Sequence, residues 1–259
     1  MYLEQVNPYS IGKQHKRDKL HIVERIRLLF DPESFVEYYP EDKYTGYDGV
    51  ITGYGNIYGQ RVYFYGQDFT HMGGTFGYQH SQQIIAIIKE AIIQRKPIIG
   101  IYDGGGARIQ EGAASVAGCG ELFRMNTMAS GVIPQIAIIA GTCAGGAVYS
   151  PGLTDFVFTI EKISNLFVTG AKVINEVQGT DYLIEELGGA SIHSAVSGVA
   201  HFRMNTEREC YAQVRKLIDM LPPCYSKERG YRTDTYHEKD LSDIRLLLPK
   251  DKQEGYDVR

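Results

Sequence analysis

A run of thirty residues without a charged side chain, Met125 to Thr154, constrains this chain more than any other feature. Asn126, Gln135 and several glycines interrupt the run, which argues against a membrane-spanning helix. We therefore expect the run to be buried inside a folded domain. It holds neither a carboxylate nor a general base, and no cationic residue flanks its one thiol, Cys143. If the segment is catalytic, its backbone must supply the chemistry.

The run contains the second of two similar units, each with an apolar strand, a glycine turn and a helical segment. The units are PIIGIYDGGGARIQEGAASVAGCGELFRM (97–125) and GVIPQIAIIAGTCAGGAVYS (131–150), with their glycine turns about forty residues apart. A third apolar segment follows at 155–160. The repeat predicts an α/β fold with a parallel sheet or a spiral of strand and helix turns. Functional loops are then expected at the carboxyl ends of the strands.

Apolar spacing predicts the remaining elements. Residues 19–30, 78–96 and 207–221 have the periodicity of amphipathic helices, and the helix over 78–96 is expected to end in a cationic last turn. Residues 49–65 are typical of a β-hairpin that turns at 58–60. The segment GQDFTHMGGTFG that follows is a glycine-rich loop. We predict one domain over 1–223 and a polar linker or tail over 224–259.

Charge and cysteine content exclude several classes of protein. The net charge is −4 with a pI near 6.0, and basic residues cluster only in KQHKRDK at 13–19, which argues against a nucleic-acid partner. We expect that run to be a solvated helix flank, or else a basic arm that meets a phosphate. The four cysteines have neither metal-site nor disulfide-framework spacing, and the amino terminus has no apolar run. Reduced thiols and the lack of a signal predict a cytoplasmic protein.

Both glycine turns join a buried strand to a helix, where free backbone N–H groups and the positive end of the helix dipole converge. Glycine lets a ligand approach such a backbone closely. The candidate donors are therefore in the two turns, at Gly105, Gly106, Gly145 and Gly146. The alternative is that these glycines only permit tight turns and close packing. Because DGGGAR fits neither GxGxxG nor GxxxxGK[ST], a nucleotide site is not indicated.

Side chains near the turns offer weaker candidates. Asp103 and Glu111 are possible acid and base groups of a hydratase-like site, but a turn-capping Asp and a first-turn helix Glu explain them more simply. Ser150 lies in YSPG and not in GxSxG, so a nucleophile elbow is not supported. The histidines are expected to be structural or loop residues with satisfied partners, namely His71, His80, His193 and His201.

Several segments, in order and at ordinary spacing, resemble the amino-terminal half of carboxyltransferase subunits of biotin-dependent acyl-CoA carboxylases, of the propionyl-CoA and methylmalonyl-CoA type. The resemblance runs from about residue 11 to about residue 223 and includes VERIRLLFDPESFVEY, GGGARIQEG, SGVIPQIAIIAGTCAGGAVYSPGLTDF and ELGGASIH. Two motifs depart from the family pattern. This chain reads HIVERI at 21–26 where the family commonly reads TARERI, and Gly152 replaces the alanine of SPALTDF.

The resemblance implies a crotonase-like (ClpP/crotonase) spiral of ββα units that binds an acyl-CoA thioester. Mapped by motif, two sets of backbone amides would form the oxyanion site for the thioester enolate, those of Gly105, Gly106 and Ala107 and those of Ala144, Gly145 and Gly146. The family uses no separate protein base, because carboxybiotin releases CO2 and its ureido nitrogen takes the α-proton. The active site of such enzymes lies between the amino-terminal half of one subunit and the carboxyl-terminal half of another.

The implied function is transfer of a carboxyl group between carboxybiotin and the α-carbon of a short acyl-CoA. Biotin is expected on a separate carrier protein, and no metal is expected in this chain. The implied partners are a carboxyl-terminal carboxyltransferase half on another chain, a biotin carboxylase and the biotin carrier, in an oligomer. Three alternatives remain open: the reverse reaction in a membrane-linked acyl-CoA decarboxylase, a non-catalytic CoA-binding or assembly module, and a stand-alone hydratase that uses Asp103 or Glu111.

Overall fold

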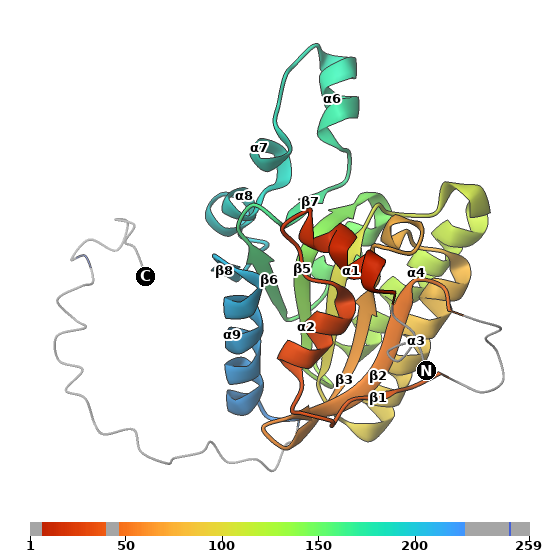
Figure 1. The fold of residues 1–259 in the computed structure, drawn as a ribbon, viewed down its shortest axis with the longest axis vertical. Coiled ribbons are helices and arrows are strands. Elements are labelled where there is room, and N and C mark those ends of the chain that lie inside the picture. The colour runs from red at the N-terminus through yellow and green to blue at the C-terminus, as the bar shows by residue number, and fades with distance from the viewer. Residues whose placement is uncertain (1–6, 40–46, 226–248, 250–259) are drawn as a thin grey trace. The chain divides into compact units, whose positions relative to one another are not determined.

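A mixed β-sheet with helices on both faces organises the chain (Figure 1). The computed structural model describes residues 7–39, 47–225 and 249. Neighbouring strands follow the order β1, β2, β3, β4, β5, β6, β8, and β7 pairs with β5. The strands are β1 (Val36–Glu37), β2 (Val50–Ile57), β3 (Gln60–Gln67), β4 (Ile98–Gly104), β5 (Gln135–Ala144), β6 (Phe156–Ile160), β7 (Asn165–Phe167) and β8 (Phe202–Met204).

The sheet begins with antiparallel strands and continues with parallel ones. Strands β2 and β3 form the predicted hairpin, but its turn consists of Tyr58 and Gly59 alone, with φ of 50° and 75°, and Gln60 already belongs to β3. Two positive φ values are typical of the tight turns that match the twist of a hairpin. From β3 onwards every pairing is parallel. The parallel sheet predicted from the repeated unit is therefore confirmed.

Helices cover both faces of this sheet (Figure 1). Apolar side chains of α3 and α4 pack on one face and those of α2 and α9 on the other, so two hydrophobic cores enclose the strands. Because β4 and β5 are buried on both faces, their sequences are almost continuously apolar. The helices are α1 (Pro8–His15), α2 (Ile22–Leu29), α3 (Tyr78–Gln94), α4 (Ala113–Ala129), α5 (Tyr149–Gly152), α6 (Ala171–Gln178), α7 (Ile184–Gly188), α8 (Ala190–Ala195) and α9 (Glu207–Met220).

One helix prediction needs correction. Helix α3 ends at Gln94, because Arg95 adopts a left-handed conformation with φ of 53°, so the basic residues follow the helix and do not form its last turn. In the second repeated unit the helical segment predicted after β5 is present and short. It is a 3₁₀ helix, Gly145–Val148, followed by the single turn of α5. This matters because a 3₁₀ turn places glycine amides directly at the end of the strand.

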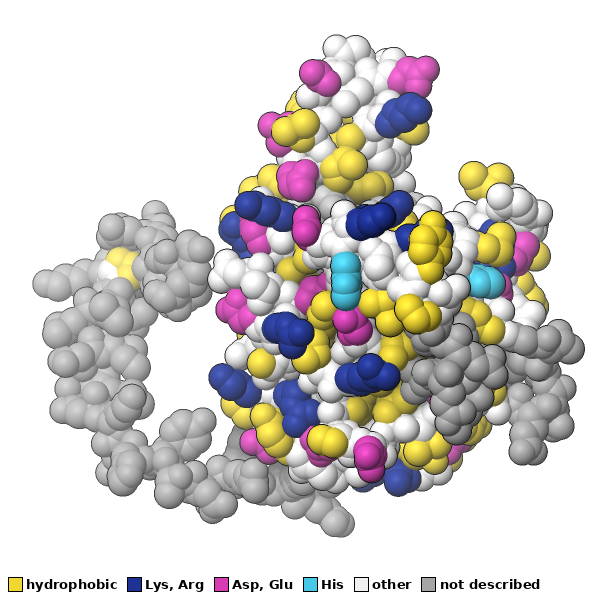
Figure 2. Space-filling view, viewed as in Figure 1, with side chains coloured by type: hydrophobic (Ala, Val, Ile, Leu, Met, Phe, Trp, Pro, Cys, Tyr) yellow, Lys and Arg dark blue, Asp and Glu magenta, His cyan; other side chains and the backbone are white. Residues whose placement is uncertain are grey.

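Residues 168–189 form an arm that carries α6 away from the sheet and returns through α7, which packs against β7 (Figure 1). Among the described elements, none makes extensive contact with α6. Figure 2 shows apolar and acidic side chains together on this arm. The Asn175 side chain holds the arm together, since it accepts from Tyr182 N and donates to Tyr182 O, both at 2.9 Å.

The expected domain division stays a prediction. Most of the linker or tail expected at 224–259 lies outside the described residues. Within the part of the chain that the structure describes, no helix is long and apolar enough to cross a membrane.

Candidate functional site

Two neighbouring parallel strands, β4 and β5, deliver the two glycine turns to the same edge of the sheet. The strands pair residue by residue from Ile98 and Gln135 up to Tyr102 and Ile139. The register then shifts, and the next pair joins Gly104 to Cys143. Strand β5 therefore carries extra residues at 140–142, an irregularity of the kind that bends a strand. Pairing resumes at Gly104 and Cys143, so this bulge lies immediately before each strand ends in glycines.

The two turns touch each other. Gly106 has φ of 94°, and a Cβ added to it would lie 2.8 Å from Ala144 O and 3.9 Å from Gly145 N. Both the backbone conformation and the close approach thus require glycine at position 106. Gly145 also has a positive φ, 61°, but a Cβ there would meet no atom within 4 Å. The turns therefore form one backbone surface at the ends of β4 and β5.

Two amides on this surface have no partner among the described residues, and two others open a helix. Within the described residues, the N–H groups of Gly106 and Ala107 donate to no other group. Gly145 and Gly146 open a 3₁₀ helix, so their N–H groups precede its first internal hydrogen bond. Unpaired backbone donors are rare in folded proteins unless water or a ligand satisfies them. The two turns are therefore able to bind an oxyanion or a carbonyl oxygen.

The six predicted donors are not equivalent in the structure. The Gly105 N–H donates to Gly73 O at 3.2 Å. Ala144 is the last residue of β5 and pairs with Phe167 of β7. The role of the six residues, Gly105, Gly106, Ala107, Ala144, Gly145 and Gly146, as oxyanion donors stays a prediction.

A third glycine loop supports the first turn and was missed as a site element. Gly73 and Gly74 lie in the loop after β3, and a Cβ at Gly74 would overlap Asp103 O. A Cβ at Gly104 would overlap Gly74 O in turn. The segment HMGGT therefore packs backbone against backbone with the end of β4. Its glycine pair was the only signal in the sequence, and nothing there indicated which strand end it touches.

Asp103 is neither a turn cap nor a free acid or base, so both sequence interpretations of it are wrong. Its carboxylate is fully buried and accepts from Lys19 Nζ at 2.6 Å and from Arg25 Nη1 at 2.9 Å. Lys19 was expected on a solvated flank, yet it is only 9% exposed. Burial lowers the pKa of Lys19, and the Asp103 carboxylate opposes that shift. The pair belongs to a buried ionic cluster behind the first turn.

Glu111 caps a different helix from the one expected. Its carboxylate accepts from Tyr78 N at 2.6 Å, at the start of α3, and from Arg108 Nη1 at 2.7 Å. Arg108 also pairs with Asp48 at 2.8 Å and donates to Thr75 O at 3.1 Å. Because these bonds engage Glu111 and Arg108 with the protein itself, the hydratase-like site that uses Asp103 or Glu111 is not supported.

The hydroxyl and thiol groups near the second turn are buried in structural roles. Ser150 Oγ lies 2.8 Å from Tyr102 Oη and donates to Asn126 Oδ1 at 2.8 Å. Tyr102 Oη in turn lies 2.6 Å from Tyr65 Oη, and burial raises the pKa of Tyr65 to about 12. Burial also raises the pKa of the Cys143 thiol, so the thiolate is disfavoured. No group in this chain of contacts is set up as a nucleophile, as the sequence indicated.

The histidines are partnered, as expected. His80 is fully buried, with Nδ1 2.8 Å from Asp48 O, and burial lowers its pKa to about 4. His193 Nε2 lies 2.8 Å from Leu166 O, and His201 Nδ1 accepts from Val157 N at 3.0 Å. His71 pairs with Asp48 at 3.9 Å and is partly exposed. Within the described residues no cluster of histidine, cysteine and acidic side chains is placed to hold a metal ion.

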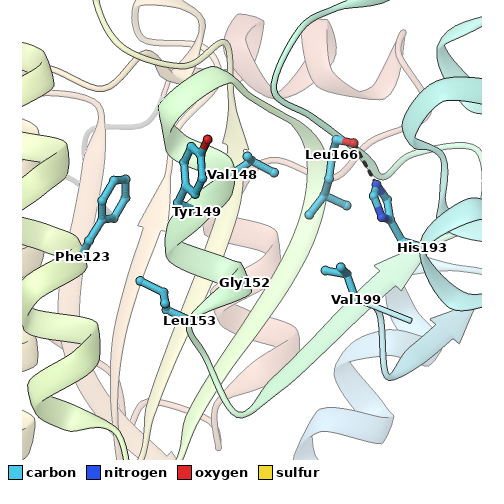
Figure 3. Close-up of a pocket in the computed structure, with 8 residues that line it drawn as sticks. All are labelled: Phe123, Val148, Tyr149, Gly152, Leu153, Leu166, His193 and Val199. Carbon is cyan, nitrogen blue, oxygen red and sulfur yellow. Dashed lines mark hydrogen bonds between the residues drawn. The ribbon is translucent and has the colours of Figure 1, made fainter. Parts of the chain in front are cut away.

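An apolar cavity of about 340 Å³ lies beside the second turn (Figure 3). Val148 ends the 3₁₀ helix, and Tyr149, Gly152 and Leu153 follow it along α5, so one wall of the cavity continues directly from the glycine amides. The hydrogen bond between His193 and Leu166 closes the opposite wall. The complete lining is Phe123, Val148, Tyr149, Gly152, Leu153, Leu166, His193 and Val199.

Comparisons with known proteins agree with the resemblance seen in the sequence. The profile of the carboxyl transferase domain family matches residues 13–259. The beta chain of mitochondrial propionyl-CoA carboxylase from Sus scrofa is 46% identical over 264 residues, which cover 96% of this chain and 49% of that protein. The alpha subunit of methylmalonyl-CoA decarboxylase from Veillonella parvula is 44% identical over 262 residues, which cover 96% of this chain and 51% of that protein.

A solved structure gives the same result for the fold. The crystal structure of transcarboxylase 12S, described as a hexamer with hydrolysed methylmalonyl-coenzyme A bound, matches with a TM-score of 0.85 and 39% identity. The match covers 97% of this chain and 52% of that one. The predicted α/β crotonase-like fold is confirmed. This chain spans about half the length of the relatives that it matches.

Proposed function

The chain belongs to the carboxyl transferase domain family, and on that premise we propose that it is the acyl-CoA-binding half of a biotin-dependent carboxyltransferase. The observation that carries this proposal is the meeting of the two glycine turns, with unpaired amides at Gly106 and Ala107 and helix-opening amides at Gly145 and Gly146. Removal or replacement of an α-proton beside a thioester places negative charge on the carbonyl oxygen. Fixed N–H donors are the groups that stabilise such charge without reorganisation.

The residues around the turns fit a reaction whose carboxyl donor and proton acceptor both come from outside this chain. Asp103 and Glu111 are held by cationic partners, and Ser150 is held by Asn126. Carboxybiotin on a separate carrier would supply the carboxyl group and accept the α-proton. The contribution of this chain is then to bind the thioester, to orient its carbonyl oxygen and to donate backbone hydrogen bonds to it.

The surroundings of the turns increase the effect of those bonds. The strand that precedes the second turn is buried, and the adjacent cavity is lined by apolar side chains. Charge interactions strengthen where water is excluded, because the local dielectric constant is low. One oxyanion donor contributes roughly 3–4 kcal/mol of transition-state stabilisation in enzymes where it has been removed by mutation. Two turns of backbone donors are therefore sufficient for a large rate effect without a reactive side chain.

The proposal includes partners, because the matched relatives are about twice as long as the region that this chain covers. The partners are a carboxyl-terminal carboxyltransferase half on another polypeptide, a biotin carboxylase and a biotinylated carrier, in a cytoplasmic oligomer. The substrate is proposed to be a short acyl-CoA, since the relatives are named for propionyl-CoA and methylmalonyl-CoA. The transcarboxylase structure is itself described as a hexamer with a methylmalonyl-CoA derivative bound.

Reconstitution tests this function. The chain, purified with the polypeptide that supplies the second half, is mixed with biotin carboxylase, biotinylated carrier, ATP, bicarbonate and propionyl-CoA. We expect ATP-dependent formation of methylmalonyl-CoA that stops when this chain is omitted. Binding of propionyl-CoA without turnover, with every partner present and active in a control reaction, would instead identify a non-catalytic CoA-binding module.

A further inference from the structure

Four charged side chains form a buried cluster behind the first glycine turn, and the chemistry proposed above does not use them. Arg25 of α2 is at its centre and is 1% exposed. Its guanidinium donates to Asp103 at 2.9 Å and to Glu207 of α9 at 2.8 Å. Lys19 completes the cluster through Asp103 at 2.6 Å. Tyr211 donates its hydroxyl to Glu207 at 2.8 Å.

The cluster contacts the bulge between β4 and β5. Asp103 belongs to β4 and directly precedes the glycines of the first turn. Arg25 Nη2 donates to the carbonyl oxygen of Ala140 at 2.7 Å, inside the irregular part of β5. A Cβ at Gly141 would overlap the Asp103 carboxylate and lie 2.9 Å from Lys19 Nζ. The Arg25 guanidinium thus contacts residues of both strands, and Gly141 of β5 lies directly against the Asp103–Lys19 pair.

Stability alone does not explain this arrangement. Replacing a buried ion pair by apolar side chains of similar size is often neutral or stabilising, so a four-charge cluster is a poor way to join helices to a sheet. Arg215 of α9 also binds the carboxyl end of α2, where it donates to Leu29 O at 2.7 Å and pairs with Asp31, which follows the helix, at 2.8 Å. Asp31 accepts from the hairpin turn as well, and none of these bonds involves β4 or β5. The buried cluster differs in holding the two strand ends.

We propose that Lys19, Arg25 and Asp103 are positioning residues that fix the bulge between β4 and β5 and hence the spacing between the amide donors of the two glycine turns. The proposal rests on the proposed carboxyltransferase function for its catalytic consequence. The structural role of these three residues does not depend on that function. A guanidinium suits the task because its planar fork binds several acceptors in fixed directions, which an ammonium group does not do.

The decisive variant is the double replacement Lys19→Met with Asp103→Asn, because it removes one charge of each sign and leaves the Arg25–Glu207 pair intact. Each single replacement leaves an uncompensated buried charge and is expected to lower Tm more than the double replacement does. We expect the double variant to fold but to lose at least tenfold in kcat, with KM for propionyl-CoA changed less than threefold. Misplaced donors affect the transition state more than the ground state. If the double variant had the kcat and the Tm of the wild-type protein, the positioning role would be overturned.

Arg215→Met is the matched control, since it breaks the bonds of α9 to the end of α2, away from the glycine turns. It should leave kcat per folded molecule unchanged. Hydrogen exchange gives a readout that needs no activity. In the double variant, the bonded amides of 103–105 and 141–144 should exchange faster, while those of the β2–β3 hairpin keep their wild-type rates. Unchanged exchange at the turns would contradict the proposal even if the wild-type chain has no carboxyltransferase activity. Absence of activity in the wild-type chain would contradict only the proposed function.

Discussion

Individual glycines in the two turns are not equivalent, and the differences make the donor hypothesis testable residue by residue. Gly106 combines a positive φ with a close approach to Ala144, so any side chain there changes the fold. Gly146 has no such constraint, because its φ is not in the left-handed region and a Cβ would lie 3.8 Å from Cys119 Sγ, an ordinary contact. Position 146 therefore separates catalytic from structural effects.

Replacing Gly146 by valine is expected to lower kcat/KM for propionyl-CoA at least tenfold, because the side chain stands beside an amide that is proposed to face the thioester oxygen. The free energy of unfolding should change by about 1 kcal/mol or less, as is usual for substitutions without a clash. Gly105→Ala is the control, since the Gly105 amide is already bonded and a Cβ there makes only an ordinary contact with Thr75. If both variants were as active as the wild-type protein, Gly146 would have a structural role only.

His80 predicts a pH dependence of stability. Its pKa in the folded protein is about 4, lowered by burial, against an ordinary value near 6.5. The unfolded chain therefore binds the proton more readily, and the stability contributed by the neutral side chain is lost as pH falls from about 6.5 to about 4. Between pH 7 and pH 5 this loss is about 2 kcal/mol. Urea unfolding at the two pH values measures it.

The comparison that isolates this effect is His80→Gln, which retains the neighbouring Asp48, Arg108 and His71. The variant will be less stable at both pH values, but the difference between them should shrink by about 2 kcal/mol relative to wild type. An identical difference in both proteins would show that other groups set the acid sensitivity.

Single residues were the least predictable part of the site. The sequence located the glycine turns, but Asp103 looked like a turn cap and Lys19 like a surface residue, although they meet across 84 positions of the chain. Gly73 and Gly74 were seen only as parts of a loop. These contacts depend on which elements lie side by side, and a linear pattern of residue types contains no such information.

Among the elements, the short helix α5 is held in place by a buried polar residue, Ser150, which has no role in the proposed reaction. Ser150 ties it to α4 through Asn126 and to β4 through Tyr102. The helix is only one turn long, so its own hydrogen bonds stabilise it little. Its position, and that of the 3₁₀ helix before it, therefore depends on this buried contact.

Ser150→Ala is expected to lower the free energy of unfolding by about 1–3 kcal/mol, because it leaves Asn126 Oδ1 buried without its donor. Activity per folded molecule should fall by less than threefold, which chemical denaturation and steady-state kinetics on the same preparation can establish. Loss of all activity in a folded variant would mean that Ser150 takes part in the reaction after all.

Elements with clear apolar periodicity were predicted well from the sequence. The hairpin, the helices over 78–94 and 207–220 and the strands β4, β5 and β6 all appear where the pattern placed them. The 3₁₀ helix at Gly145 and the arm over 168–189 did not follow from periodicity. Short helices contain too few residues for an apolar periodicity to be recognised in the sequence.

At the scale of the whole molecule, the arm presents an apolar surface that the described residues do not cover. Val173 and Val177 of α6 are 54% and 79% exposed, and Leu183 is 64% exposed. Exposed apolar groups on an internally bonded segment are typical of interaction sites. Under the proposed function, we expect the polypeptide that supplies the second half to bind to this exposed apolar surface.

Val173→Asp combined with Val177→Asp should weaken that association at least tenfold, because each carboxylate would have to lose water on binding. Val116→Asp, at a 63% exposed position of α4, is the matched control. Sedimentation velocity of each variant with the second polypeptide measures the effect. Undiminished association of the arm variant would place the interface elsewhere, and loss in the control alone would place it on α4.

The central claim is that backbone amides of the two glycine turns bind the thioester oxygen. The most direct measurement is a crystal structure of the chain with a propionyl-CoA analogue in which a methylene group replaces the thioester sulfur. We expect the carbonyl oxygen to lie about 3 Å from one or more of the amides of Gly106, Ala107, Gly145 and Gly146. A carbonyl oxygen held by a side chain, or lying away from both turns, would contradict it.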